Sequence, residues 1–427
     1  MRGGGGAIFG VAALVTSRTP EHAIATPPRP AYRTWRTVAR KAGSRRIEVA
    51  TRPGVFADGD EDAAAQLLAR FVTVREGDAC VVLGSGNGLA AAALPAGVTL
   101  HCADRHVANV EATRRTLALH GREGATVAHA HGVASPGAPD DGDALRLADA
   151  SVDAVLVRVP HEKAALLPLV LDAHRVLRDG GRCWLAGGNH EGIRPAVSLL
   201  ETCFGGVATA GQGGGARVVV ATKRGAALPD DPALRTPWHD RAAFREVPVH
   251  VRDEAFVAYT RPGVFSWDHL DEATALLAES LRVERGARVL DLGCGAGVLG
   301  VVASRLAGVA ATCVDADAEA LRCARRTLAG AAVAEARVLA SDAAEAVLDE
   351  HFDVVVTNPP FHHGKATALD VPRQFIADAH AVLARGGWLQ LVANRTLPYE
   401  QALRDVFGDH AVVVESPRFK VLAARKR

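Results

Sequence analysis

Residues 288–300 read RVLDLGCGAGVLG, a pattern that indicates a strand, a glycine-rich turn and a helix in succession. Its first five residues, RVLDL, form a short pattern typical of a buried strand, and a helical pattern follows the glycines. Glycines at a strand-to-helix turn let a ligand approach the backbone closely, and the helix N-terminus offers free N–H groups. We therefore expect a parallel α/β sheet with a ligand held at Gly293, Gly295 and Gly297. Asp291, inside the strand, is placed to meet a cationic or amino-bearing ligand.

Two further acidic residues follow the next two strands. Asp315 ends the first of them and is placed to accept hydrogen bonds from ribose hydroxyls, and Asp342 follows the second and could read an adenine amino group. Because Gly300 also completes a G-x-G-x-x-G pattern, a nicotinamide or flavin enzyme is an open alternative. The strand ends before Gly293, however, and Asp291 lies within it, which weighs against that alternative.

A second motif, Asn358-Pro359-Pro360-Phe361, ends the apolar strand 352–357. The two prolines lack backbone N–H groups and stop the strand, which leaves carbonyl acceptors beside the Asn side chain. An acceptor cluster next to an aromatic ring suits a planar substrate with an exocyclic amino group. Taken alone, Asn-Pro could equally be an ordinary strand-ending turn.

The glycine loop, the two acids and the Asn-Pro-Pro-aromatic motif, in this order, resemble class I S-adenosylmethionine-dependent methyltransferases. Residues 358–364, Gly386-Gly387, 392–395 and 418–421 are similar to ribosomal RNA guanine-N2 methyltransferases, both the C-type enzymes that act on the small ribosomal subunit and the G-type enzymes that act on the large one. The resemblance covers residues from about 245 onward well, and the first half by architecture. It implies methylation of the exocyclic N2 of a guanosine in rRNA, most directly 16S rRNA, with S-adenosyl-L-methionine as cofactor.

In this interpretation Asn358 Oδ1 and the Pro359 carbonyl accept from the guanine amino group, and Phe361 stacks on the base. Tentative RNA contacts are His362, Lys365, Arg395, Arg418 and Lys420. Three alternatives stay open: a 23S rRNA enzyme, an amino methyltransferase acting on protein glutamine or DNA adenine, and a noncatalytic RNA-binding protein.

The chain contains an internal duplication. Thr51–Phe56 recurs unchanged as Thr260–Phe265, an offset of 209 residues, and three glycines of the loop recur at the same offset. A repeat of this length fits two whole domains rather than a solenoid unit. Asp291 corresponds to Val82 and Asn358 to Arg158, so the first copy is expected to be degenerate and without catalysis.

We thus expect two tandem Rossmann-like methyltransferase domains. The predicted boundaries are a basic, disordered extension (1–46), a degenerate domain (47–225), a linker (226–244) and a catalytic domain (245–427). The extension holds nine basic residues and one acidic residue, while the whole chain carries a net charge of +1. Residues 47–427 therefore carry a net negative charge. A net negative charge does not fit a general nucleic-acid coating protein, but it is compatible with an enzyme that recognises one folded site in rRNA or a ribosomal subunit.

The seven cysteines are dispersed, and none forms a C-x-x-C pair. This pattern predicts reduced thiols, a cytoplasmic location and no metal site. The apolar run 7–15 is too short to cross a membrane, and a signal or transit peptide there is an alternative to a disordered extension. We expect a monomer without a membrane partner.

Overall fold

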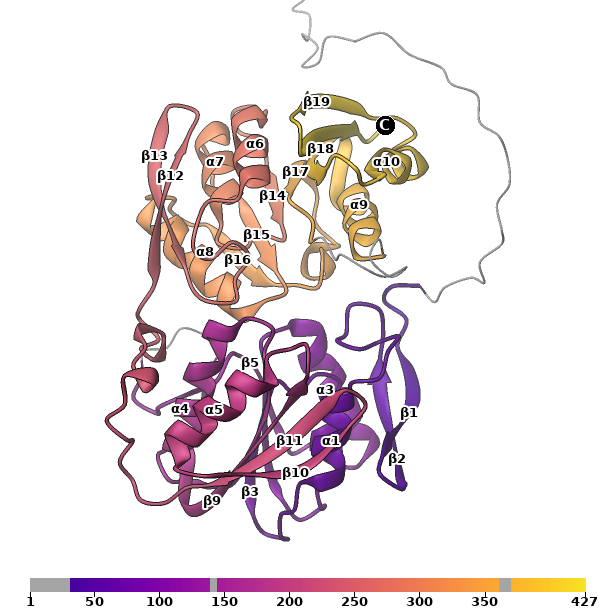
Figure 1. The fold of residues 1–427 in the computed structure, drawn as a ribbon. Helices are drawn as coiled ribbons and strands as arrows, with labels where there is room; N and C mark the ends of the chain where they lie inside the picture. Colours follow the sequence, from indigo (N-terminus) through magenta and orange to yellow (C-terminus); the bar gives the residue numbers. More distant parts are fainter. Residues whose placement is uncertain (1–30, 139–143, 361–369) are drawn as a thin grey trace, which may run out of the picture. The chain divides into compact units, whose positions relative to one another are not determined.

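The computed structural model describes residues 31–138, 144–360 and 370–427 (Figure 1). Two seven-stranded sheets dominate it, one in each half of the chain. The first has the order β10-β11-β9-β8-β3-β4-β5, and the second has the order β16-β15-β14-β17-β18-β20-β19. Replacing each strand of the first sheet by its counterpart reproduces the second. The predicted duplication is therefore confirmed at the level of topology.

In the first half, the strands are β3 (Ala79–Leu83), β4 (Thr99–Asp104), β5 (Thr126–His129), β8 (Val152–Arg158), β9 (Leu177–Gly188), β10 (Val207–Gly213) and β11 (Ala216–Thr222). The helices are α1 (Ala63–Phe71), α2 (Leu89–Ala92), α3 (Val107–Leu119), α4 (Leu166–Val176) and α5 (Ile193–Phe204). The pairs from β5 through β9 are parallel, and β11 is antiparallel to both its neighbours. A short pair, β6 (Val133–Ala134) and β7 (Leu145–Arg146), stands apart.

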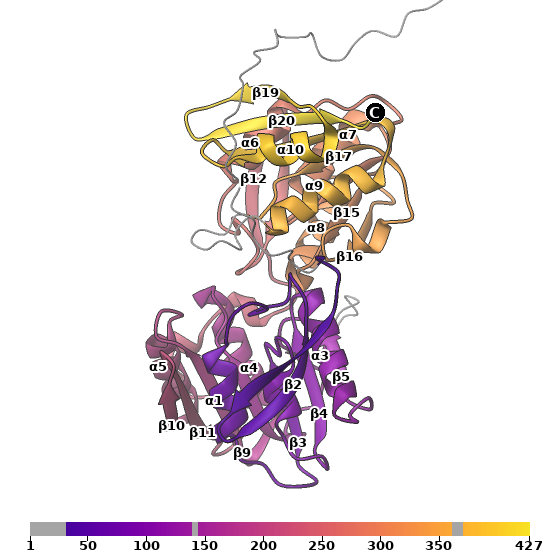
Figure 2. The same cartoon turned by 90° about the vertical axis from the view of Figure 1, so that its right-hand side faces the viewer.

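In the second half, the strands are β14 (Val289–Leu292), β15 (Thr312–Asp315), β16 (Arg337–Ala340), β17 (Phe352–Thr357), β18 (Leu383–Asn394), β19 (Ala411–Glu415) and β20 (Phe419–Arg425). The helices are α6 (Glu272–Ser280), α7 (Val298–Ala307), α8 (Ala318–Gly330), α9 (Asp370–Val382) and α10 (Tyr399–Phe407). Helices α9 and α10 lie side by side, as both views show (Figures 1 and 2). The last two strands, β19 and β20, form an antiparallel hairpin.

The spacing of apolar residues at 375, 376, 379, 382 and 383 predicts a helix with one apolar face, and α9 confirms it. Phe375, Ile376, Ala379 and Val382 are all buried against the sheet, in one core with Leu383. A core forms on each face of the second sheet, so β14 and β17 are buried on both sides, as parallel strands under helices are.

A hairpin precedes each sheet: β1 (Arg36–Ala42) with β2 (Arg45–Thr51), and β12 (Arg245–Val251) with β13 (Glu254–Thr260). Strand β1 lies inside the extension predicted to be disordered up to residue 46, so that prediction is wrong for residues 36–46. The apolar run 7–15 lies outside the described residues. Between the halves, 226–244 contains only the short 3₁₀ turns Pro232–Leu234 and Pro237–His239. In the described part of the chain, no helix is long and apolar enough to span a membrane.

Candidate functional site

The glycine loop follows β14 as the sequence predicts. Gly293, Gly295 and Gly297 have φ values of +74°, +53° and +82°, in the left-handed region that favours glycine. A Cβ on Gly297 would lie 3.1 Å from the Cα of Ala324, so this glycine also permits close packing on α8. At Gly295 a Cβ would meet no atom within 4 Å, so the loop faces open space there.

Asp315, at the end of β15, braces this loop. Its Oδ2 accepts the N–H of Gly295 at 2.8 Å, and its Oδ1 accepts the N–H of Asp317 at 2.9 Å. Burial and the neighbouring Asp317 carboxylate raise the pKa of Asp315 above its usual value. The remaining lone pairs of the carboxylate can accept from ligand hydroxyls.

Asp291 lies elsewhere than expected. Its side chain is completely buried under Gly300, and it does not line the cavity described below. Burial raises the pKa of Asp291 to about 7, opposed by the N–H of Gly300. Direct contact of this carboxylate with a ligand is therefore not supported, because the side chain is completely buried and is not part of the cavity wall.

Asp342 follows β16 and lines the cavity. Two side chains of the first half contact its carboxylate. Tyr32 donates its hydroxyl to Asp342 Oδ1 at 2.9 Å, and Arg52 Nη2 lies 3.1 Å from Oδ2. Arg52 also pairs with Glu345 at 2.6 Å. Burial raises the pKa of Asp342, against the lowering effect of nearby His106 and Arg52.

Asn358 occupies the end of β17, followed by buried Pro359 and exposed Pro360. Its amide nitrogen donates to Asp271 Oδ2 at 3.1 Å and to Thr274 Oγ1 at 2.9 Å. Its Oδ1 is buried and has no hydrogen-bond partner. An amide whose donors are used and whose acceptor is vacant offers an acceptor to a substrate amino group.

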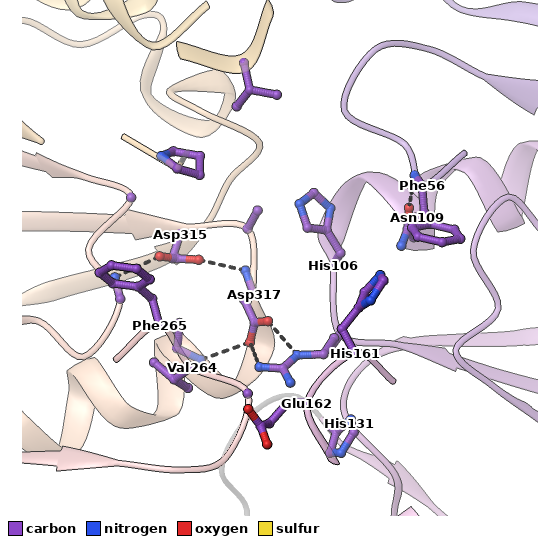
Figure 3. A pocket seen from close by; sticks show the side chains of 18 of the residues that line it. Phe56, His106, Asn109, His131, His161, Glu162, Val264, Phe265, Asp315 and Asp317 are labelled. Atoms are coloured by element: carbon purple, nitrogen blue, oxygen red, sulfur yellow. Dashed lines mark hydrogen bonds and ion pairs between the residues drawn. The ribbon is translucent and has the colours of Figure 1, made fainter. Parts of the chain in front are cut away.

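These groups line one cavity of about 1330 Å³. Gly293, Gly295, Asp315, Asp342 and Asn358 all contribute to its wall. Figure 3 shows part of it, including Asp315, Asp317 and Phe265. Asp317 forms an ion pair with Arg105, whose Nη2 lies 2.8 Å from Oδ1.

The predicted RNA contacts have mixed outcomes. Phe361, His362 and Lys365 lie outside the described residues. The side chains of Arg395 and Arg418 are 56% and 69% exposed, and pair with Glu415 and Glu272 on the surface.

Lys420 does not fit an RNA-binding role. It is 6% exposed, and its ammonium donates to Glu400 at 2.5 Å, so the charge is buried and neutralised inside the domain. The prediction for Lys420 is wrong because its position in the inner strand β20 turns the side chain away from solvent.

Sequence reasoning missed much of the cavity wall, including Asp271, Thr274 and Phe265. Asp271 caps α6, a role its position before a helical pattern indicates. Phe265 ends the repeated Thr-Arg-Pro-Gly-Val-Phe motif and is 63% exposed, an unusual exposure for a large aromatic side chain.

The first half keeps the loop geometry but not the acceptor. Asp104 accepts the N–H of Gly86 at 2.8 Å and that of His106 at 2.9 Å, as Asp315 does in the second half. Sequence reasoning missed Asp104, although the match of Cys-Ala-Asp at the end of β4 with Cys-Val-Asp at the end of β15 indicates it. Arg158, at the place of Asn358, is held by Glu191 at 2.7 Å and by Asp62 at 3.4 Å. It is therefore not a free phosphate ligand.

All seven cysteines are buried free thiols. Among the described residues, no cluster of His, Cys, Asp and Glu could hold a metal ion.

Comparisons with known proteins show the family of this chain. The family model described as methyltransferase small domain matches residues 46–220 and again 255–423. The ribosomal RNA small subunit methyltransferase C of Shewanella amazonensis is 35% identical over 280 residues, 65% of this chain and 79% of that protein. The protein of the same name from Escherichia coli K12 is 43% identical over 166 residues, 39% of this chain and 48% of that protein.

A solved structure is similar over nearly the whole chain. It is that of the T. thermophilus 16S rRNA N2 methyltransferase in complex with AdoMet and guanosine, with a TM-score of 0.76 and 27% identity. The match covers 92% of this chain and 98% of that one.

Proposed function

Because the chain belongs to the methyltransferase small domain family, with both copies of the domain present, we propose a specific activity. The protein transfers a methyl group from S-adenosyl-L-methionine to the exocyclic N2 of a guanosine in 16S rRNA. One observation carries this proposal: Asn358 Oδ1 is buried and has no hydrogen-bond partner, while the amide nitrogen is already bonded. This oxygen can accept a hydrogen bond from an amino group on the substrate.

The residues present fit the cofactor. The open space at Gly295 admits a ligand against the backbone, and the Asp315 carboxylate is placed for the ribose hydroxyls. Asp342 Oδ2 lies near Arg52 without hydrogen-bond geometry, so it can still accept from the adenine amino group. Bound S-adenosyl-L-methionine supplies a methyl group already activated on sulfur, and its thioether leaves without charge.

The protein then mainly has to position the nucleophile. Asn358 Oδ1 and the Pro359 carbonyl accept from the two N–H bonds of the guanine amino group, which turns the nitrogen lone pair toward the methyl group. Nitrogen forms a bond to carbon as the sulfur–carbon bond breaks, and the nitrogen then loses one proton to solvent. No strong general base is needed, because the methylated amino group is acidic while it carries the positive charge.

The first half does not catalyse methyl transfer in this proposal, since Arg158 fills the acceptor position with a bound guanidinium. Phe361 stacks on the target base, which must leave its helix to reach the cavity. Arg395 and Arg418 contact RNA phosphates, because their surface ion pairs are weak enough to exchange. The chain acts as a monomer, which light scattering of the purified protein tests.

The deciding experiment is mass spectrometry of nucleosides from 16S and 23S rRNA with and without the gene. We expect N2-methylguanosine to be lost from 16S rRNA alone. Loss from 23S rRNA, or unchanged N2-methylguanosine in both rRNAs, would contradict the proposal.

A further inference from the structure

The proposed reaction requires the Asn358 amide to point one way. A primary amide has two ends of nearly equal size, one an acceptor and the other a donor of two hydrogen bonds. With Oδ1 toward the cavity, it accepts from a substrate amino group. Turned by 180°, it would place N–H groups against the N–H groups of the substrate, and the reaction would lose its orienting contact.

The neighbours of Asn358 distinguish the two orientations. Its nitrogen lies 3.1 Å from Asp271 Oδ2, and a carboxylate can only accept. The same Oδ2 accepts the N–H of Thr274 at 2.8 Å and the hydroxyl of Thr274 at 3.1 Å. Because the hydroxyl proton is directed to Asp271, the Thr274 oxygen presents a lone pair to Asn358 at 2.9 Å. Both neighbours are therefore acceptors, and a turned amide would set oxygen against oxygen.

We propose that Asp271 and Thr274 are positioning residues that fix the orientation of the Asn358 amide, so that Oδ1 faces the substrate. This inference rests on the proposed function. It assigns to the cap of α6 a part in catalysis, although neither residue touches the reacting atoms.

The cap is rigid enough for this task. Asp271 starts α6, and the Thr274 N–H that it accepts is one of the donors left free at a helix N-terminus. The buried face of α6, with Ala273, Leu277 and Ala278, packs into the core under the sheet. The carboxylate is thus held by the helix on one side and by Asn358 on the other.

The first half provides an internal comparison. Asp62, at the position of Asp271, caps α1 by accepting from the N–H groups of Ala64 and Ala65. It faces Arg158, which stands where Asn358 does. Ala65 corresponds to Thr274 in the first half, and it has no hydroxyl. A carboxylate thus faces a donor in both copies, and the threonine hydroxyl is present only where the donor is an amide that can turn.

The test uses the full chain, with single-turnover methyl transfer at saturating S-adenosyl-L-methionine and 16S rRNA. Asp271→Asn keeps a good helix cap but can offer an N–H to Asn358, so the amide is no longer fixed. We expect the rate to fall about 10- to 100-fold, with unchanged affinity for the cofactor. Asp62→Asn is the matched control. It alters the same cap in the first half and should leave the rate unchanged.

Two further measurements separate positioning from mere folding. Thr274→Ser should keep the rate and Thr274→Val should lower it, because only the hydroxyl is involved. In an Asn358→Ala background, Asp271→Asn should cause no additional loss, since there is no amide left to orient.

The possible outcomes are distinct. Equal losses from Asp271→Asn in both backgrounds, or equal rates for Thr274→Ser and Thr274→Val, would overturn the inference. If residual activity in the Asn358→Ala background is too low to measure, the Thr274 pair decides. Full activity of Asn358→Ala itself would instead contradict the proposed function.

Discussion

Asp104 and Asp315 occupy the same place in the two copies of the fold. Each ends the strand after the glycine loop, and each accepts the N–H of the middle glycine at 2.8 Å. The two halves therefore differ less in the cofactor loop than at the acceptor position, where Asn358 is replaced by Arg158.

Because of this similarity, Asp104 provides a matched control for the role of Asp315 in cofactor binding. Asp315→Ala should weaken binding of S-adenosyl-L-methionine by about 1–3 kcal/mol, the usual loss for a charge-assisted hydrogen bond. Asp104→Ala should leave it unchanged, with one cofactor bound per chain. Calorimetric titration of the full chain measures both. A drop in stoichiometry for Asp104→Ala would show that the first half also binds the cofactor.

Asn358→Ala should reduce methyl transfer about 100- to 1000-fold, because it removes the acceptor that orients the nucleophile. Cofactor affinity should stay the same, since Asn358 lies on the substrate side of the reaction. Methylation of rRNA with labelled cofactor gives the rate. An activity close to that of the unaltered protein would rule out the acceptor role.

Arg158→Ala is expected to affect stability rather than catalysis. Its guanidinium is 11% exposed and shared between Glu191 and Asp62, so its removal leaves two partly buried carboxylates without their partner. Loss of one member of such a cluster costs about 3–5 kcal/mol when fully buried, and less here. Thermal unfolding should show a lower Tm, with the single-turnover rate of the folded protein retained. A lower rate at unchanged Tm would mean that Arg158 serves the substrate.

Glu319 should contribute to acid sensitivity. Burial acts to raise its pKa, but Arg322 and Arg261 overcome this effect and lower it to about 2. The folded pKa is below the unfolded value, so the contribution is fully present above about pH 4.5 and is lost as the pH falls toward 2. Burial lowers the pKa of Arg261, yet a guanidinium stays charged throughout this range.

The measurement is the free energy of unfolding as a function of pH, for the unaltered chain and for Glu319→Gln. We expect the substitution to remove roughly 3 kcal/mol of pH-dependent stability between pH 4.5 and 2. Parallel curves for the two proteins would contradict this assignment.

The sequence predicted those features that depend on local pattern. The glycine loop, Asp315, the end of β17 and the helix α9 follow from periodicity and from residues with special backbone requirements. The repeat of Thr51–Phe56 indicated the duplication before any strand order was known.

Features that depend on side-chain direction could not be predicted in this way. Asp291 and Lys420 carry charges, which suggested ligand contacts, but each lies in an inner strand whose pleat turns the side chain into the domain. The role of Asp271 depends on contact with Asn358 across 87 positions of the chain, and no local pattern reports such a contact. Strand β1 was missed because three of its seven residues are basic, which resembles a charged tail.

The position of β11 and β20 has a consequence for the synthesis of the protein. Each is the last strand of its sheet in chain order, yet each lies inside the sheet, between β9 and β10 or between β18 and β19. The edge strands β10 and β19 lie next to β11 and β20, so neither edge strand can join its sheet before its partner has been synthesised. A chain emerging from the ribosome can finish its first sheet at residue 222, while the second waits for Phe419–Arg425. The nascent catalytic half is therefore the part most exposed to aggregation, at a time when the half without catalysis is already folded.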